Sequence, residues 1–327
     1  MAINENEVDI VIGATKSNLT IFMSEWKPIF SRFHLIIVKA PELKEELILP
    51  EGFNVDIYDK SDIESIAGLS SATLFSGNSC KFFGFLVSKK KYVISIDEDS
   101  IPAKDTKGVT TDPVEQHLTN LATPATPFFF NTLYDPYRKG ADFVRGYPFS
   151  LRSGVPCALS HGLWSNAEVA CPLYVDAVLT IPSKVVLPMS GHNFALDKVL
   201  GAAMVPSFKL DDVNWVTMDD LWRGMCAKTV ADHMGVGVKS GLPYVLLKGK
   251  AEATDLLKED PAGVKLMDEV VPFFEGLKLP ETATSAVDCV VEIAKAAHEK
   301  LGNSHTAFGA AADAMINWAA LWKRYAS

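Results

Sequence analysis

The sequence predicts an α/β fold with a mostly parallel central sheet. Short apolar runs alternate with helical patterns from Val8 to Ile96, and a helical pattern fills the region from about 283 to 327. Strands that alternate with helices pair in parallel through right-handed crossovers. Such sheets bind ligands at the carboxyl ends of their strands. Polar residues that directly follow a strand are therefore the first candidates for a functional site.

Each early element has its own local signal. Strands are predicted at the apolar runs Val8–Gly13, Phe33–Val38, Phe53–Tyr58 and Tyr92–Ile96. Helix starts are predicted at Asn18, which suits an N-cap, at Ser61 with Glu64 in a capping-box pattern, at Cys80, and at Asp112-Pro113. The segment from Thr123 to Gly154 is rich in proline and aromatic residues, and we expect ordered functional structure there. We expect a single elaborated domain over residues 1–327, with no internal repeat.

Composition restricts the partners. The 327 residues carry a net charge of −9, which argues against nucleic acid as a partner. An acidic protein that binds an anionic nucleotide needs a metal ion or a local group of Arg and Lys. The N-terminus lacks a signal-peptide pattern and no apolar run has the length of a membrane span. The five cysteines are widely spaced without a C-x-x-C, so we expect reduced thiols in a cytosolic protein.

The strongest local signal is Asp97-Glu98-Asp99, which directly follows the predicted strand Tyr92–Ile96. An Asp-x-Asp pair is often only a solvated turn. At the carboxyl end of a buried strand, however, Asp97 and Asp99 can hold Mg²⁺ or Mn²⁺ and so bridge the protein to a diphosphate. We therefore predict metal-dependent diphosphate binding by these two residues.

An arginine-aromatic segment is the second candidate. Arg145 and Arg152 stand among Gly, Pro and aromatic residues between Phe128 and Arg152. Guanidinium groups suit phosphate oxygens, and aromatic faces suit sugars or bases. The alternative is that the aromatic residues fill the core while the arginines extend to solvent. Composition leaves both interpretations open.

Weaker candidates lie further along the chain. Asp219 and Asp220 could contact a sugar or act as a base, although Asp219 also suits an N-cap before a helix near Leu221. His233 could be a third metal ligand, although a lone histidine is more often structural. Lys239, on a Gly-rich stretch, could approach a phosphate, but it belongs to no Walker motif.

Several common site motifs are missing from the sequence. No G-x-G-x-x-G follows the first strand, so we expect neither NAD nor flavin. The chain also lacks a G-x-S-x-G elbow and a kinase signature.

Together these segments resemble the plant reversibly glycosylated polypeptides, the UDP-arabinopyranose mutases. The resemblance runs from about Val8 to Trp322 and is most specific over Pro124–Pro136 and Gly140–Arg152. It implies a glycosyltransferase type A-like fold, a nucleotide-sugar-binding domain, and interconversion of UDP-arabinopyranose and UDP-arabinofuranose for cell-wall synthesis. It also implies dependence on Mn²⁺ or Mg²⁺, assembly with copies or paralogues, and a cytosolic protein attached peripherally to the Golgi.

The resemblance also assigns residues. Arg145 matches the arginine that becomes glycosylated, and Arg152 matches a second arginine required for activity. Asp97 and Asp99 match the outer acids of the family's metal motif. Lys81, expected to bind substrate, stands where many members carry Arg, and Lys cannot make a planar bidentate contact.

Two further departures bear on activity. Glu98 replaces the middle acid of the family's usual triple aspartate. The loop between Trp164 and Tyr174 is shorter than in typical members, which carry a basic stretch there. The chain is therefore expected to be a mutase. The alternative is a weak or inactive member that serves as a partner subunit for an active paralogue.

Overall fold

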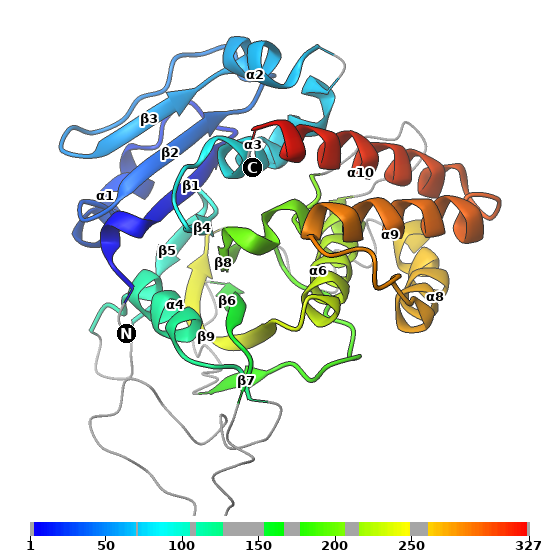
Figure 1. Cartoon of the computed structure of the whole chain (residues 1–327). Coiled ribbons are helices and arrows are strands. Elements are labelled where there is room, and N and C mark those ends of the chain that lie inside the picture. Colours follow the sequence, from blue (N-terminus) through cyan, green and yellow to red (C-terminus); the bar gives the residue numbers. More distant parts are fainter. Residues whose placement is uncertain are drawn as a thin grey trace, which may run out of the picture.

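The computed structural model describes residues 3–69, 71–104, 109–126, 154–166, 177–206, 216–248 and 261–325. One mixed sheet runs through these ranges in the order β3-β2-β1-β4-β8-β6-β9-β5, and β7 pairs with β9 (Figure 1). The strands are β1 (Val8–Ala14), β2 (His34–Lys39), β3 (Asn54–Tyr58), β4 (Tyr92–Ile96), β5 (Ser100–Pro102), β6 (Cys157–Asn166), β7 (Val178–Thr180), β8 (Asn193–Asp197) and β9 (Gly237–Leu247).

The sheet changes character at β4. From β3 through β2 and β1 to β4 the neighbours are parallel, as the alternation of strands and helices predicted. Beyond β4, strand β8 runs antiparallel, with Ile96 opposite Asn193. This reversal brings the start of β8 to the edge of the sheet where β1 and β4 end.

Helices cover both faces of the sheet. They are α1 (Thr20–Phe30), α2 (Lys60–Ala67), α3 (Lys81–Val87), α4 (Pro113–Ala122), α6 (Val216–His233), α8 (Pro261–Gly276), α9 (Ala286–Leu301) and α10 (Thr306–Tyr325), with short 3₁₀ turns η1 (Glu5–Glu7), η2 (Ala72–Phe75), η3 (Gly77–Cys80) and η5 (Lys198–Ala203). Residues of α1 and α4 share one apolar core with Ile10 and Ile12 of β1. Residues of α3, α6, α9 and α10 share the other core, which includes Val11. Alternate residues of β1 are thus buried on opposite faces, as expected for a central parallel strand.

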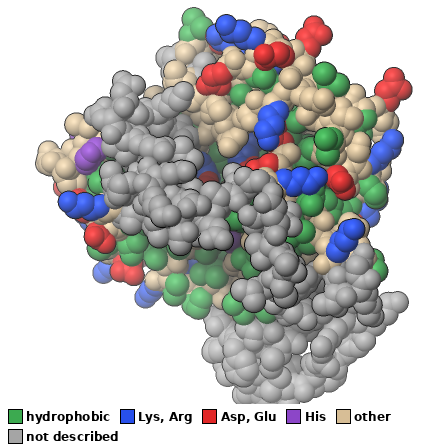
Figure 2. Space-filling model, turned by 180° about the vertical axis from the view of Figure 1, so that it is seen from behind, with side chains coloured by type: hydrophobic (Ala, Val, Ile, Leu, Met, Phe, Trp, Pro, Cys, Tyr) green, Lys and Arg blue, Asp and Glu red, His purple; other side chains and the backbone are tan. Residues whose placement is uncertain are grey.

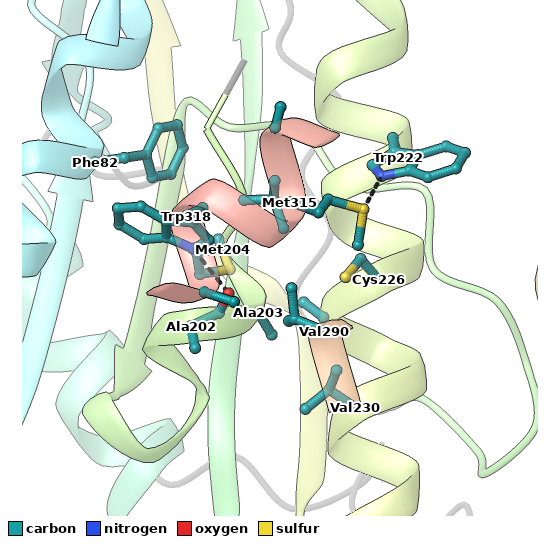
Figure 3. Packing of buried hydrophobic residues seen from close by; sticks show 14 of the residues in the cluster. Phe82, Ala202, Ala203, Met204, Trp222, Cys226, Val230, Val290, Met315 and Trp318 are labelled. Carbon is teal, nitrogen blue, oxygen red and sulfur yellow. Dashed lines mark hydrogen bonds between the residues drawn. The ribbon is translucent and has the colours of Figure 1, made fainter. Parts of the chain in front are cut away.

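Two tryptophans connect helix α10 to its neighbours η5 and α6 (Figure 3). Trp318 of α10 is fully buried, and its Nε1 donates to the carbonyl of Ala202, 2.8 Å away. Trp222 of α6 directs its Nε1 at the sulfur of Met315, 3.4 Å away. Because a buried indole needs a partner for its N–H, these contacts fix how α10 lies between η5 and α6.

The fold confirms the predicted α/β class and agrees with the expected type A-like arrangement, in which the acidic motif follows β4. Two helix starts differ in detail. Asp59, not Ser61, caps α2, and its capping-box partner is Asp62. Helix α1 begins at Thr20 with Leu19 at the cap position, so Asn18 is not its N-cap, although Asn18 Oδ1 accepts a hydrogen bond from Thr20 N.

The surface is of mixed charge. In the view from behind, basic and acidic side chains are interspersed over the described part of the surface (Figure 2). Within the described ranges, none of the helices combines the length and the apolar character that crossing a membrane requires.

A glycine at the contact between helix and sheet leads to a stability prediction. A Cβ on Gly84 of α3 would lie 2.5 Å from Val11 Cγ1, whereas one on Gly309 of α10 would meet nothing within 4 Å. Gly84→Ala should lower the free energy of unfolding by about 1–3 kcal/mol because the core is overpacked. Gly309→Ala should raise it by up to about 1 kcal/mol through helix propensity.

Urea unfolding of both variants and the parent protein measures the difference. If Gly84→Ala were as stable as Gly309→Ala, the close approach of α3 to β1 would be wrong.

Candidate functional site

The Asp97–Asp99 motif lies at the carboxyl edge of the parallel strands. The cavity there has a volume of about 180 Å³ and is lined by Gly13, Thr15, Lys16, Asn78, Asp97, Glu98 and Asp99. It opens between the ends of β1 and β4, the place where open α/β sheets bind ligands. Its volume is below the roughly 300–1,000 Å³ of a pocket that encloses a whole drug-sized ligand. It is therefore large enough for only part of a ligand of that size.

Asp97 is held by two side chains from different parts of the fold, Lys81 and His192. Lys81 Nζ donates to Asp97 Oδ1 at 2.7 Å and to the carbonyl of Gly191, also at 2.7 Å. The Nδ1 of His192 lies 2.6 Å from Asp97 Oδ2. Burial alone would raise the pKa of Asp97, but Lys81 and His192 outweigh it and hold the pKa well below its ordinary value. Asp97 therefore carries its charge at neutral pH.

His192 reaches this position because β8 is antiparallel to β4. Ile96 pairs with Asn193, so Asp97, which follows β4, lies opposite His192, which precedes β8. The backbone N–H of Asp97 accordingly donates to the carbonyl of His192 at 3.1 Å. Asp97, Asp99 and His192 each offer one ligand atom, and these atoms lie within 4.8 Å of one another.

This set of donors fits a divalent cation. Ligand atoms on opposite sides of an octahedral Mg²⁺ ion, with bonds of about 2.1 Å, lie about 4.2 Å apart, close to the spacing here. Carboxylate oxygens suit Mg²⁺ and Mn²⁺, and an imidazole shifts the preference toward a transition metal. Asp97 and Asp99 were predicted as ligands from the sequence, whereas His192 was not.

Glu98, between the two aspartates, turns toward the end of β1. Its carboxylate accepts hydrogen bonds from the backbone N–H of Thr15, at 3.2 Å, and from the Thr15 hydroxyl. Burial raises the pKa of Glu98, and the bonds from Thr15 oppose that change. Glu98 thus ties the loop after β1 to the loop after β4 and is not one of the three residues whose ligand atoms cluster there.

The second acidic pair lies in the first turn of α6, which begins at Val216. Asp219 is therefore not the N-cap of a helix near Leu221. Asp220 Oδ2 accepts from the backbone N–H of Gly191 at 2.9 Å, and Oδ1 pairs with Arg223. The structure thus links Asp220 to the segment that carries His192.

Asp219 has an altered ionisation. Burial raises the pKa of Asp219 to about 7, a rise that Asp220 supports and Arg223 opposes. A carboxyl with such a pKa can give or accept a proton near neutral pH.

The ammonium of Lys239, predicted to approach a phosphate, makes hydrogen bonds inside the fold. It lies on β9, and its ammonium donates to the carbonyls of Asn120 and Thr123 and to the Thr123 hydroxyl at 2.6–2.9 Å. A lysine has three donors, and all three close the C-terminal end of α4. Burial lowers the pKa of Lys239. The Gly-rich stretch around it is a strand, not a phosphate loop.

His233 is not placed with the metal ligands. It ends α6, and its Nε2 lies 2.8 Å from the carbonyl of Ala283. Asp220, which does reach the site, is 13 residues earlier on the same helix. At 1.5 Å per residue this separation is roughly 20 Å, so the rigid helix keeps His233 away.

Arg145 and Arg152, and most of the loop between Trp164 and Tyr174, lie outside the described residues. Lys81, which was predicted to bind substrate, contacts Asp97. Thr15, Lys16 and Asn78 line the cavity but were not singled out from the sequence. Their positions in the chain could have indicated them, because Thr15 and Lys16 directly follow β1 and Asn78 lies in η3.

Replacing Lys239 separates a structural role from a binding role. Lys239→Met should lower the free energy of unfolding by about 1–3 kcal/mol because buried carbonyls lose their donor. The folded variant should bind UDP with Mn²⁺ as tightly as the parent protein, measured by titration calorimetry. The exposed Lys295→Met serves as a control for charge removal. A tenfold loss of UDP affinity in Lys239→Met alone would contradict this assignment.

Asp219 predicts a pH dependence of stability. Its pKa is about 7 in the folded chain and near 3.8 ordinarily, so its contribution to stability is present at low pH and is lost as pH rises toward 7. Asparagine does not ionise, so the free energy of unfolding of Asp219→Asn should rise relative to that of the parent protein as the pH is raised from 5 to 8. Urea unfolding at both pH values measures this change, and an equal difference at both would count against a raised pKa.

Comparison with known proteins now gives the family. The model of the family described as reversibly glycosylated polypeptide matches residues 3–327. "Probable UDP-arabinopyranose mutase 5" of Arabidopsis thaliana is 56% identical over 98% of this chain and 97% of its own. "Probable inactive UDP-arabinopyranose mutase 2" of Oryza sativa subsp. japonica is 51% identical over 99% of this chain and 98% of its own. "UDP-arabinopyranose mutase 1" of Arabidopsis thaliana is 42% identical over 97% and 92%.

Among solved structures, S. aureus TarS 1–349 aligns over 98% of this chain and 91% of its own, with 11% identity and a TM-score of 0.37. A likeness at this level does not identify a relative. The family match and the sequence identities do identify the family, because they extend over nearly the whole chain. The chain belongs to the reversibly glycosylated polypeptide family.

Proposed function

We propose that this protein is a metal-dependent UDP-arabinopyranose mutase that interconverts UDP-L-arabinopyranose and UDP-L-arabinofuranose. The observation that carries the proposal is the Asp97, Asp99 and His192 cluster beside a cavity at the carboxyl edge of the sheet. Relatives that bear the mutase name match nearly the whole chain at 42% and 56% identity, which supports this reaction.

The reaction requires the anomeric C–O bond to UDP to break, the sugar ring to change its closure, and UDP to reattach. The departing diphosphate carries negative charge, and a bound Mn²⁺ or Mg²⁺ would supply the opposite charge there. Asp97, Asp99 and His192 would hold that ion. Lys81 keeps Asp97 ionised and orients its carboxylate.

Other residues would handle the sugar. Asp219, with a pKa of about 7, is suited to move a proton on a sugar hydroxyl, and Asp220 positions the segment around Gly191. We assign Arg145 and Arg152 to the sugar and phosphates by electrostatic contact. A guanidinium stays protonated and is a poor nucleophile, so glycosylation of Arg145 would be a side reaction.

The finer biology follows the family and is part of the same proposal. We expect Mn²⁺ or Mg²⁺ rather than flavin or NAD, and UDP-sugars as ligands. We also expect assembly with copies or paralogues, and cytosolic protein held peripherally at the Golgi, where its product supplies cell-wall synthesis.

A second function is favoured by one comparison. The rice relative named as probably inactive is 51% identical to this chain, close to the identity of the relative named as a probable mutase. Two sequence features also favour this function. Lys81 stands in place of the arginine that many members carry, and the loop after Trp164 is short. In this alternative the protein binds UDP-sugar weakly and serves as a subunit beside an active paralogue.

The mutase assay distinguishes the two functions. Purified protein is incubated with UDP-arabinofuranose and MnCl₂, and the pyranose and furanose forms are separated chromatographically. We expect conversion by the parent protein and a loss of at least about 100-fold in Asp97→Asn. Glu292→Gln, which removes an exposed carboxylate on α9, should convert at the parent rate. No conversion by a parent protein that still binds UDP would favour the partner-subunit function.

Arg145→Lys tests the guanidinium itself. Lysine keeps the positive charge but loses the planar pair of donors, so the conversion rate should fall. A parent-like rate in Arg145→Lys would defeat any specific role for that group.

A further inference from the structure

The segment Ser190–Asn193, which carries His192, is fixed from several sides. The backbone N–H of Ser190 donates to the Nε2 of His161 at 3.2 Å. Gly191 donates its N–H to Asp220 and accepts from Lys81 through its carbonyl. These bonds hold the segment on the side that precedes His192, and a separate set holds the side that follows it.

Asn193 anchors the following side through its amide group. Its Nδ2 donates to the carbonyls of Leu163, at 3.3 Å, and Pro243, at 3.2 Å. A Cβ on Gly162 would lie 2.2 Å from this Nδ2, so the glycine leaves room for the amide. Because Nδ2 is the donor, the remaining Oδ1 must be an acceptor, and it lies 2.8 Å from the Nε2 of His117.

His117 is fully buried on α4, and the surrounding donors fix its tautomer. Its Nδ1 lies 2.8 Å from Ser160 Oγ, and Ser160 Oγ accepts from the Nδ2 of Asn120 at 3.0 Å. The hydroxyl proton of Ser160 is thus directed at His117 Nδ1, and His117 donates from Nε2 to Asn193. Burial also lowers the pKa of His117 to about 3, so the ring is neutral, with one donor and one acceptor.

We propose that His117 is a positioning residue for the candidate site, acting through Asn193 to keep His192 against Asp97. The ring nitrogens of His117 bond to Ser160 and Asn193, and its Nε2 proton satisfies the buried acceptor next to His192 in the chain. Without that proton, Asn193 Oδ1 would be a buried acceptor with no donor from His117, which is costly. The amide would then shift or turn, and the start of β8 would move with it. The inference that this positioning aids turnover rests on the proposed function.

Two substitutions of similar polarity separate the two bonds of His117. In His117→Gln, the side-chain amide nitrogen lies near the position of Nε2 and can still donate to Asn193. In His117→Asn, the shorter amide reaches only the position of Nδ1, so the bond to Ser160 is kept and the bond to Asn193 is lost. Thermal unfolding of both variants shows how far each is destabilised.

The readout is the ring N–H that His192 directs at Asp97, observed by NMR in metal-free protein with isotope-labelled histidine. The His192→Gln variant identifies the signal by its loss. We expect the signal in the parent protein and in His117→Gln, and its loss, or hydrogen exchange at least about tenfold faster, in His117→Asn. An unchanged signal in His117→Asn, or no signal in the parent protein, would overturn the proposal.

Asn193→Ala gives a second test if His117→Asn does not fold. It removes the amide through which His117 acts but leaves His117 and its bond to Ser160 in place. Exchange of the His192 proton should again accelerate, and an unchanged rate would overturn the proposal. Because this experiment involves neither metal nor turnover, its failure would leave the mutase proposal standing. A failed mutase assay would likewise leave the NMR result intact.

Discussion

The buried carboxylate of Asp97 is the constraint on which the site depends. A charge removed from water is stable only when it is paired and hydrogen-bonded. Asp97 meets this requirement through Lys81 from α3 and His192 from the start of β8. Helix α3 must therefore lie close to β1, which Gly84 permits, and β8 must run antiparallel beside β4.

The same requirement shapes the surroundings of the site. Lys81 and Asp220 both bind Gly191, one at its carbonyl and the other at its N–H, so the residue before His192 has little freedom. Glu98 meanwhile binds Thr15 and draws the loop after β1 toward the acidic motif. Ligands, cavity wall and supporting segment are thus parts of one connected polar network. In the proposed reaction, such preorganisation would favour electrostatic stabilisation of the departing diphosphate.

The sequence predicted the half of the sheet whose order follows the chain. Strands β1 to β4 have apolar runs and local connections, and Asp97 and Asp99 could be placed because a strand directly precedes them. His192 could not be found in this way. It reaches Asp97 only through the antiparallel pairing of β4 with β8, which are almost 100 residues apart in the chain, and no local pattern encodes that pairing.

Tertiary contacts also determine the positions of two other sequence candidates. Lys239 and His233 have residue types that suit phosphates and metals, but tertiary contacts with Thr123 and Ala283 use their polar groups elsewhere. Ser190-Gly191-His192-Asn193 did offer a signal, since it precedes the apolar run of β8. When two neighbouring strands are antiparallel, as β4 and β8 are, a histidine immediately before one lies at the same edge as acids immediately after the other.

Electron paramagnetic resonance of bound Mn²⁺ tests the central claim most directly. The protein is loaded with MnCl₂ and UDP, and the coupling of the ion to nitrogen is measured with and without isotope-labelled histidine. The account predicts a coupling to one histidine nitrogen that changes with the label and disappears in His192→Gln. Bound Mn²⁺ without a histidine coupling would contradict the assignment of Asp97, Asp99 and His192 as one metal site.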